Sequence, residues 1–272
     1  MRDRTRDIVR QKPPIEPDRR IERGSGRIER TLESSASRTF RSGHGAQYKR
    51  HMTNTQQRVT FPSSAGEASG VLVTPDGTTG KPPGVVIIQE WWGINDQIKA
   101  VAERYAAAGF VAVVPDLYHG KIAKDADEAG KMMKALDFGK AIQEIAGAVN
   151  FVRERSSGKV AITGYCLGGA LSFASAVNIR GLAAVVPFYG LPGDLDWTQI
   201  DAPVQAHFAT HDDWATVAGA QKIKDAVKVP MELHVYDAQH AFANERRPEV
   251  FHAEAAKQAQ DRALAFIRQH TK

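Results

Sequence analysis

From Val71 to the C-terminus, short apolar runs alternate with longer segments of helical periodicity, and this alternation leaves few folds open to the chain. Strands are predicted at Val71–Val73, Val85–Gln89, Val111–Val114, Val160–Thr163, Ala183–Pro187, Val204–Phe208 and Met231–Tyr236. Helices are predicted at Gln97–Ala108, Ala126–Arg155, Leu167–Val177, Ala215–Val227 and Val250–His270, the second of them broken near Gly139. The pattern predicts an α/β fold, with a mostly parallel central sheet and helices on both faces.

The first 51 residues differ from the rest in charge and composition. They carry a net charge of +7, whereas the remaining residues carry −2. Because this segment is rich in Arg, Ser and Gly and poor in apolar residues, residues 1–51 are predicted to be a disordered basic N-terminal extension, with a nucleic-acid-binding arm as the less favoured alternative. His51-Met52 is the dipeptide encoded by a common cloning site. We therefore expect Met52 to be the natural start and residues 52–272 to form one domain.

The bulk composition excludes several classes of protein. A single cysteine among 272 residues rules out an internal disulfide and a multi-cysteine zinc site, and favours a reducing compartment. No segment approaches the roughly 20 apolar residues of a membrane helix, and the N-terminus lacks the apolar stretch of a secretory signal. We expect a cytoplasmic protein that needs no cofactor and no metal and has neither a membrane nor a nucleic acid as its partner.

The one cysteine, Cys166, stands where a predicted strand gives way to a predicted helix. Gly164 and Gly168 flank it, giving the pattern G-x-C-x-G of a nucleophile elbow, a sharp turn in which glycines keep side chains from colliding. The start of a helix also favours negative charge on the sulfur. The alternative is a buried cysteine that acts only as a small apolar residue.

A cysteine nucleophile requires a base and a group that orients the base, and the sequence offers both after later strands. His240 follows the predicted strand Met231–Tyr236, and Asp212 follows the strand Val204–Phe208. Asp213 is the competing choice for the acid, since one of the two aspartates would cap the next helix. Nucleophile, acid and histidine, each after a strand, is the chain order of the α/β-hydrolase fold.

An oxyanion formed by attack of the thiol requires hydrogen-bond donors. One is predicted to be the backbone N–H of Leu167, the residue after the nucleophile, and the other would come from the turn "IIQEWWGIN". Glu90 in that turn is either a strand-end residue or a carboxylate whose charge opposes ionisation of the thiol.

The motifs "QEWWGIN", "PDLYHGK", "GYCLGG", "THDD" and "HAFAN" together resemble the dienelactone hydrolase family, over nearly all of residues 60–270. The resemblance implies a dienelactone hydrolase-like α/β-hydrolase domain over residues 52–272. It implies Cys166 as nucleophile, His240 as base, Asp212 as orienting acid and Glu90 as resting partner of the thiol, with the N–H groups of Trp91 and Leu167 as the oxyanion hole. Residues expected to line the substrate pocket are Trp92, Tyr118, His119, Trp214, Ala241, Phe242 and Asn244.

Two positions depart from the family pattern. Members of the family recognise a substrate carboxylate with two arginines, one shortly after "DLY" and one four residues beyond the histidine. Here His119, Gly120 and Lys121 follow "DLY", and Asn244 stands four residues beyond His240. Lys121, Arg246 and Arg247 are the available substitutes, although an ammonium does not reproduce the bidentate fork of a guanidinium.

The sequence therefore predicts a carboxylic ester hydrolase, similar to carboxymethylenebutenolidase, that cleaves a small ester or lactone through an acyl-cysteine. Two alternatives stay open. One is a general carboxylesterase or thioesterase whose pocket is walled by Trp91, Trp92 and Trp214, and the other is a non-catalytic binding module of the same fold. A small-molecule ester or lactone is the expected partner, and the chain is expected to act as a monomer or homodimer.

Overall fold

The computed structural model describes residues 55–77 and 80–272. The predicted basic extension of residues 1–51 and the predicted start at Met52 lie outside the described residues. Eight strands form one sheet in the order β1-β2-β4-β3-β5-β6-β7-β8. The strands are β1 (Thr55–Ser63), β2 (Gly66–Thr74), β3 (Gly84–Ile88), β4 (Val111–Pro115), β5 (Val160–Tyr165), β6 (Ala184–Phe188), β7 (Val204–His211) and β8 (Met231–Gln239).

The pairing confirms the mostly parallel sheet. Strands β1 and β2 are antiparallel to each other, β2 is antiparallel to β4, and all pairs from β4 to β8 are parallel. Strands β3, β4, β5 and β6 are buried along their whole length, as expected for strands covered on both faces. Their carboxyl ends therefore meet at one edge of the sheet, where loops are free to carry functional side chains.

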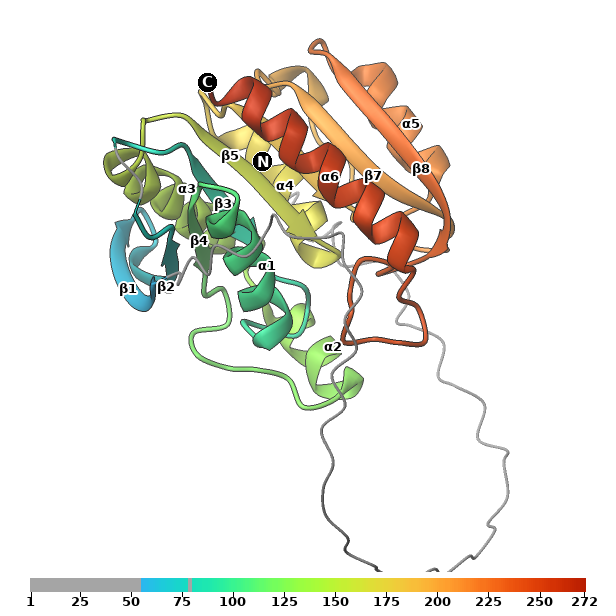
Figure 1. Ribbon diagram of the computed structural model, residues 1–272. Helices are drawn as coiled ribbons and strands as arrows, with labels where there is room; N and C mark the ends of the chain where they lie inside the picture. Colours follow the sequence, from blue (N-terminus) through green and yellow to red (C-terminus); the bar gives the residue numbers. More distant parts are fainter. Residues whose placement is uncertain (1–54, 78–79) are drawn as a thin grey trace, which may run out of the picture. The chain divides into compact units, whose positions relative to one another are not determined.

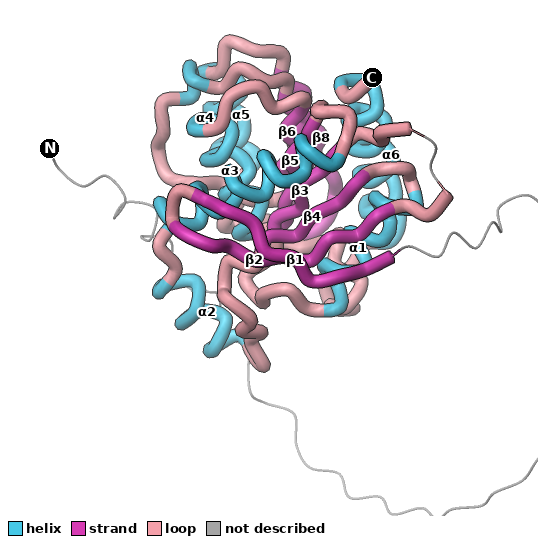
Figure 2. The backbone as a smooth tube through the Cα atoms, turned by 90° about the vertical axis from the view of Figure 1, so that its left-hand side faces the viewer, coloured by secondary structure: helices cyan, strands magenta, loops and turns pink. Residues whose placement is uncertain are grey.

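Six α-helices cover the sheet in the described part of the chain (Figure 1). Figure 2 shows α3, α4 and α5 on one face and α1 and α6 on the other. The helices are α1 (Asp96–Ala107), α2 (Ala126–Ala135), α3 (Phe138–Arg155), α4 (Leu167–Asn178), α5 (Val217–Ala226) and α6 (Ala253–His270), with a short 3-10 helix, η2 (Trp197–Gln199). None of the helices among the described residues is both long and apolar enough to span a bilayer.

The predicted elements are all present, with differences at their ends. The predicted helix 126–155 is two helices, because Asp137 caps the start of α3 by accepting a hydrogen bond from the backbone N–H of Lys140. Thr216 in the same way starts α5 two residues later than predicted. The sequence analysis missed β1, which is an edge strand with mainly exposed side chains and therefore lacks an apolar run.

Candidate active site

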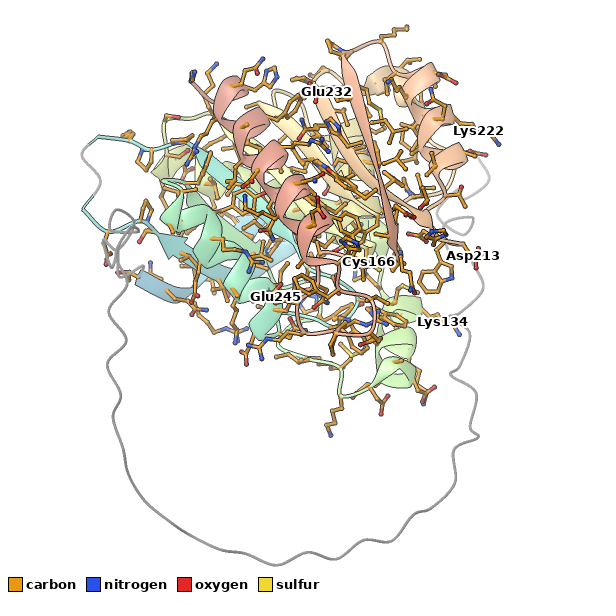
Figure 3. All side chains as sticks on the ribbon, turned by 45° about the vertical axis from the view of Figure 1, so that its right-hand side comes forward. Lys134, Cys166, Asp213, Lys222, Glu232 and Glu245 are labelled. Atoms are coloured by element: carbon orange, nitrogen blue, oxygen red, sulfur yellow. The ribbon has the colours of Figure 1, made fainter. Side chains whose placement is uncertain are left out.

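Cys166 lies between the end of β5 and the start of α4, as the elbow pattern predicts. Its backbone has φ 55° and ψ −114°, a conformation that residues with a Cβ rarely adopt. The residue is 7% exposed, and Figure 3 shows it in the interior of the molecule. Backbone strain of this kind clusters at functional sites, where the surrounding structure holds it in place.

The two flanking glycines allow strand and helix to converge. A Cβ on Gly164 would lie 2.2 Å from the carbonyl oxygen of Gly168, and a Cβ on Gly168 would lie 2.3 Å from that of Ile88. Neither position has room for a side chain. Because Ile88 ends β3, the close approach brings the turn containing Glu90 and Trp91 beside the elbow.

His240 and Asp212 form a hydrogen-bonded pair at the ends of the two neighbouring strands β8 and β7. Nδ1 of His240 lies 2.7 Å from Oδ2 of Asp212. Oδ1 of Asp212 accepts hydrogen bonds from the backbone N–H groups of Trp214 and Ala215, both at 2.9 Å. Burial raises the pKa of Asp212, but these hydrogen bonds and the charge of His240 outweigh it and hold the pKa below its usual value.

The structure pairs His240 with Asp212 and leaves Asp213 without a hydrogen bond to it. The side chain of Asp212 is 1% exposed, whereas Asp213 lies near the outer surface (Figure 3). The carboxylate of Asp212 also accepts from the N–H groups that follow it, so one aspartate both holds the histidine and caps the next turn.

His240 is electrostatically coupled to Cys166. Burial lowers the pKa of His240, but the charge of Cys166 and the hydrogen bond and charge of Asp212 raise it to about 10. Nε2 of His240, the ring nitrogen that does not meet Asp212, is buried and has no hydrogen-bond partner among the described residues. The chain order predicted from sequence thus brings together an imidazole that is hydrogen-bonded to a carboxylate and a cysteine whose charge acts on the same ring.

Glu90 is buried and has different partners from the one expected. Its Oε2 accepts a hydrogen bond from Nδ2 of Asn244 at 2.8 Å, and its Oε1 accepts from the hydroxyl of Tyr189 at 3.4 Å. Burial raises the pKa of Glu90, and the charge of His240 and the hydrogen bond from Asn244 oppose this effect. The role of Glu90 as the resting partner of the thiol stays a prediction.

Aromatic rings surround His240. The ring centroid of Trp214 lies 5.6 Å from that of His240 and 6.1 Å from that of Trp91, which lies 5.2 Å from Trp92. Tyr189, which follows β6, lies 5.3 Å from His240 on another side. The sequence analysis missed Tyr189; its position directly after a buried strand is the signal that would have identified it.

A cavity of about 250 Å³ lies between the loop after β4 and helices α2 and α3. Its walls include Leu117, Tyr118, Met132 and Leu136, and Lys121 is part of its lining. The hydroxyl of Tyr118 is buried and has no hydrogen-bond partner among the described residues. Burial and the charge of Cys166 raise the pKa of Tyr118.

The other residues predicted for the pocket occupy different environments. His119 lines the cavity and pairs with Glu144 at 3.5 Å. Ala241 and Phe242 are buried, and the Phe242 ring packs against Tyr189 at a centroid distance of 5.3 Å. Of the candidate arginines, Arg247 donates from Nε to Glu249, and its charge also lowers the pKa of Glu90. Arg246 donates its backbone N–H to Oδ1 of Asn244.

Comparison with known proteins supports the family suggested by the motifs. Residues 68–271 match the model of the dienelactone hydrolase family. Protein usf of Aquifex pyrophilus is 34% identical over 232 residues, covering 79% of this chain and 98% of that protein. A carboxymethylenebutenolidase of Pseudomonas putida is 28% identical over 229 residues, covering 77% of this chain and 94% of that protein.

The solved structures agree on the fold. A dienelactone hydrolase-like promiscuous phosphotriesterase from metagenomic libraries has a TM-score of 0.72 and 23% identity, covering 80% of this chain and 99% of that one. At this identity the likeness shows the α/β-hydrolase fold alone, which confirms the fold predicted from the chain order. With the family model spanning most of the described residues, the chain belongs to the dienelactone hydrolase family.

Proposed function

We propose that the protein hydrolyses a small ester or lactone through an acyl-cysteine intermediate, with Cys166 as nucleophile, His240 as proton carrier and Asp212 as orienting acid. The observation that supports this most directly is geometric: a cysteine strained at the elbow lies in the same site as a histidine whose Nδ1 is 2.7 Å from a buried carboxylate. The charges of Cys166 and Asp212 both raise the pKa of that histidine. Family membership supports the same class of substrate, since relatives are named carboxymethylenebutenolidases.

The first half of the proposed reaction forms the acyl-cysteine. The sulfur of Cys166 attacks the carbonyl carbon, a C–S bond forms, and the carbonyl electron pair moves to oxygen. The backbone N–H groups of Trp91 and Leu167 stabilise that oxyanion. When it collapses, the C–O bond to the alcohol breaks and the imidazolium of His240 gives its proton to the departing oxygen. In a lactone this alcohol remains tethered to the acyl group.

The second half releases the acid. Neutral His240 takes a proton from water, and the hydroxide adds to the acyl carbon. Collapse of the second tetrahedral intermediate breaks the C–S bond, restores the charge on sulfur and leaves the proton on His240. Asp212 remains ionised throughout because its lowered pKa keeps it a hydrogen-bond acceptor for Nδ1.

The surroundings suggest which substrates fit. The aromatic wall of Trp91, Trp92 and Trp214 suits a flat, unsaturated acyl group. Asn244 replaces one family arginine and bonds to Glu90, so it offers no positive charge to a carboxylate. We therefore expect neutral lactones and aryl esters to be hydrolysed at least as well as dienelactones.

A hydrolysis screen tests the proposal. Unsaturated lactones, aryl esters and thioesters are compared in the full chain and in Cys166→Ala and Cys166→Ser. The Ala variant should lose turnover by about 10³-fold or more, and the Ser variant should keep only traces, because a hydroxyl requires stronger base assistance than a thiol. Mass spectrometry of quenched reactions should find the acyl group on Cys166. Full activity in Cys166→Ala would refute the acyl-cysteine, and binding without turnover in the parent would indicate a binding module.

A further inference from the structure

We infer that a one-residue bulge in β8, held by the side chain of Thr210, selects Asp212 as the partner of His240 and makes Thr210 a positioning residue. The inference rests on the proposed function, since it concerns how the orienting acid reaches the histidine. The bulge also explains why Asp212, and not the adjacent Asp213, meets the imidazole ring of His240.

The register of β7 against β8 changes by one residue immediately before the site. From Val204, paired with Met231, to Ala209, paired with Tyr236, the partners follow in regular steps. The next partners are His211 and Gln239, so β8 has gained one residue. Asp237 and Ala238 together oppose the single residue Thr210, which is the definition of a β-bulge.

This shift decides which aspartate faces the histidine. If the pairing of His211 with Gln239 is continued by one residue along each chain segment, Asp212 stands opposite His240. The side chains of these two residues bond at 2.7 Å. Without the extra residue in β8, Asp213 would stand opposite His240. Asp212 and Asp213 directly follow the end of β7, so a shift of one residue in the register of its last pair decides which of them meets the ring.

The hydroxyl of Thr210 shares its one proton between two acceptors at the bulge. Its Oγ1 lies 3.3 Å from the carbonyl oxygen of Tyr236, where the regular register ends, and 3.3 Å from Oδ1 of Asp237, the first residue of the bulge. The ring of His211 adds a second contact, with Nε2 at 2.8 Å from the same Oδ1. That contact is largely solvent-exposed and so contributes little. Thr210 is itself exposed, but its contact with the backbone carbonyl of Tyr236 is partly buried, so this contact is the main tie across the bulge.

Tyr236, the last residue of β8 before the bulge, is anchored in the core. The hydroxyl of Tyr236 lies 2.9 Å from Nδ1 of the buried His207 and accepts a hydrogen bond from Arg262 at 3.0 Å. Tyr236 is thus fixed to β7 and α6, and the extra residue is taken up between it and His240. Bulges are rare in parallel pairs and frequent next to active sites, where they redirect side chains.

The test compares Thr210→Val, which removes the hydroxyl at nearly constant shape, with Thr210→Ser, which keeps it. Thr60→Val on the exposed edge strand β1 makes the same chemical change far from the bulge. We expect Thr210→Val to lower kcat about tenfold with KM within twofold, because a misplaced base slows the chemical step more than it weakens binding. Thr210→Ser and Thr60→Val should stay within about twofold of the parent.

A second readout requires no substrate. The pKa of His240, followed by NMR of the imidazole, should fall in Thr210→Val and remain near the parent value in Thr210→Ser, because the hydrogen bond that His240 donates to Asp212 contributes to the raised value. The other groups that act on this ring, Cys166 and Glu90, are the same in every variant. Equal pKa values and equal kcat in the Val and Ser variants would overturn the inference.

Deletion of Ala238 tests the register directly. If the variant keeps the parental circular dichroism spectrum, it should set Asp213 opposite His240, lose turnover and lose the raised pKa of His240. A folded deletion variant with parental turnover would overturn the inference. If the deletion variant does not fold, the comparison of Thr210→Val with Thr210→Ser is the deciding test. Failure of the proposed function would look different: the parent itself would show no turnover dependent on Cys166, while the pKa comparison would still report on the bulge.

Discussion

Cys166 combines a reactive side chain with a backbone conformation that opposes it. Its φ of 55° and ψ of −114° place a Cβ where only glycine is comfortable. Gly164 and Gly168 provide the space around the turn, yet the residue at its centre still carries the strain because the chemistry requires a side chain there. Function and stability therefore compete at this one position.

This competition predicts that Cys166→Gly is more stable than Cys166→Ala. Both variants lack the thiol, but only the alanine keeps the Cβ, so the glycine should raise the free energy of unfolding by about 1 kcal/mol after its greater chain entropy is subtracted. Urea unfolding of the two inactive proteins measures the difference. Equal or lower stability of the glycine variant would show that the elbow is not strained.

The charge of Cys166 should also be visible in the titration of its partner. Cys166→Ala removes that charge, so the pKa of His240 should fall from about 10 toward its usual range. Because the folded pKa lies above the unfolded value of about 6.5, the stability contributed by His240 is present below that pH and is lost as pH rises toward 10. Unfolding free energies between pH 7 and 10 should therefore decline more steeply in the parent than in Cys166→Ala.

At the scale of elements, a chain of polar side chains with exposed ends and a buried centre joins β7, β8 and α6. The chain runs from Arg262 through Tyr236, His207 and Gln205 to Glu232. The guanidinium at one end can only donate hydrogen bonds and the carboxylate at the other end can only accept them, so the hydrogen bonds in between point from the first to the second. The hydroxyl of Tyr236 must then donate to Nδ1 of His207, and Nε2–H of His207 must donate to Oε1 of Gln205. The histidine is held neutral.

Protonation of His207 should therefore destabilise the protein. Burial lowers its pKa well below 6.5, and the charges of His234 and Arg262 lower it further. The unfolded chain binds the proton first as pH falls, so stability is lost below about pH 6.5. The free energy of unfolding should drop between pH 7 and 5, and His207→Gln should reduce that slope whatever its effect at pH 7. An unchanged slope would contradict the assignment.

Strands β7 and β8 show which features of the site can be predicted from the sequence and which cannot. Cys166 and His240 follow from motif and chain order, because a turn between a strand and a helix leaves a local signature. The choice between Asp212 and Asp213 does not, because it depends on a bulge in a different strand, 25 residues or more along the chain. Glu90 shows the same limit, since its bond to Asn244 joins positions 154 residues apart. The periodicity of apolar residues predicts helices and strands, whereas the register between two strands depends on contacts between residues that are far apart in the sequence.

At the scale of the whole molecule, the site is assembled from the ends of β3, β5, β6, β7 and β8. Glu90, Cys166, Tyr189, Asp212 and His240 each follow a different strand, so no shorter piece of the described chain contains them all in place. The buried apolar core of the described residues extends from Phe61 to Ile267. Stability and catalysis should therefore depend on the same residues.

Removal of residues 1–51 tests this expectation together with the proposed domain limits. Their composition offers little to a core, so a chain that starts at Met52 should match the full chain in melting temperature and in kcat. Thermal unfolding and steady-state kinetics of the two proteins make the comparison. A loss of several degrees or a clear loss of turnover in the shorter chain would assign these residues a role in the folded enzyme.

The aromatic wall gives the enzyme an optical reporter of its own chemistry. Three of the four tryptophans form a chain of rings that ends on His240, while Trp197 packs against Phe173 instead. A charged imidazole quenches indole fluorescence more strongly than a neutral one. In the proposed reaction, acylation passes the proton of His240 to the leaving alcohol, so emission should rise in a burst as the acyl-cysteine forms and fall again as water releases the acid. Trp197→Phe should keep this signal and Trp214→Phe should lose most of it, so that each half of the reaction can be timed without a coloured substrate.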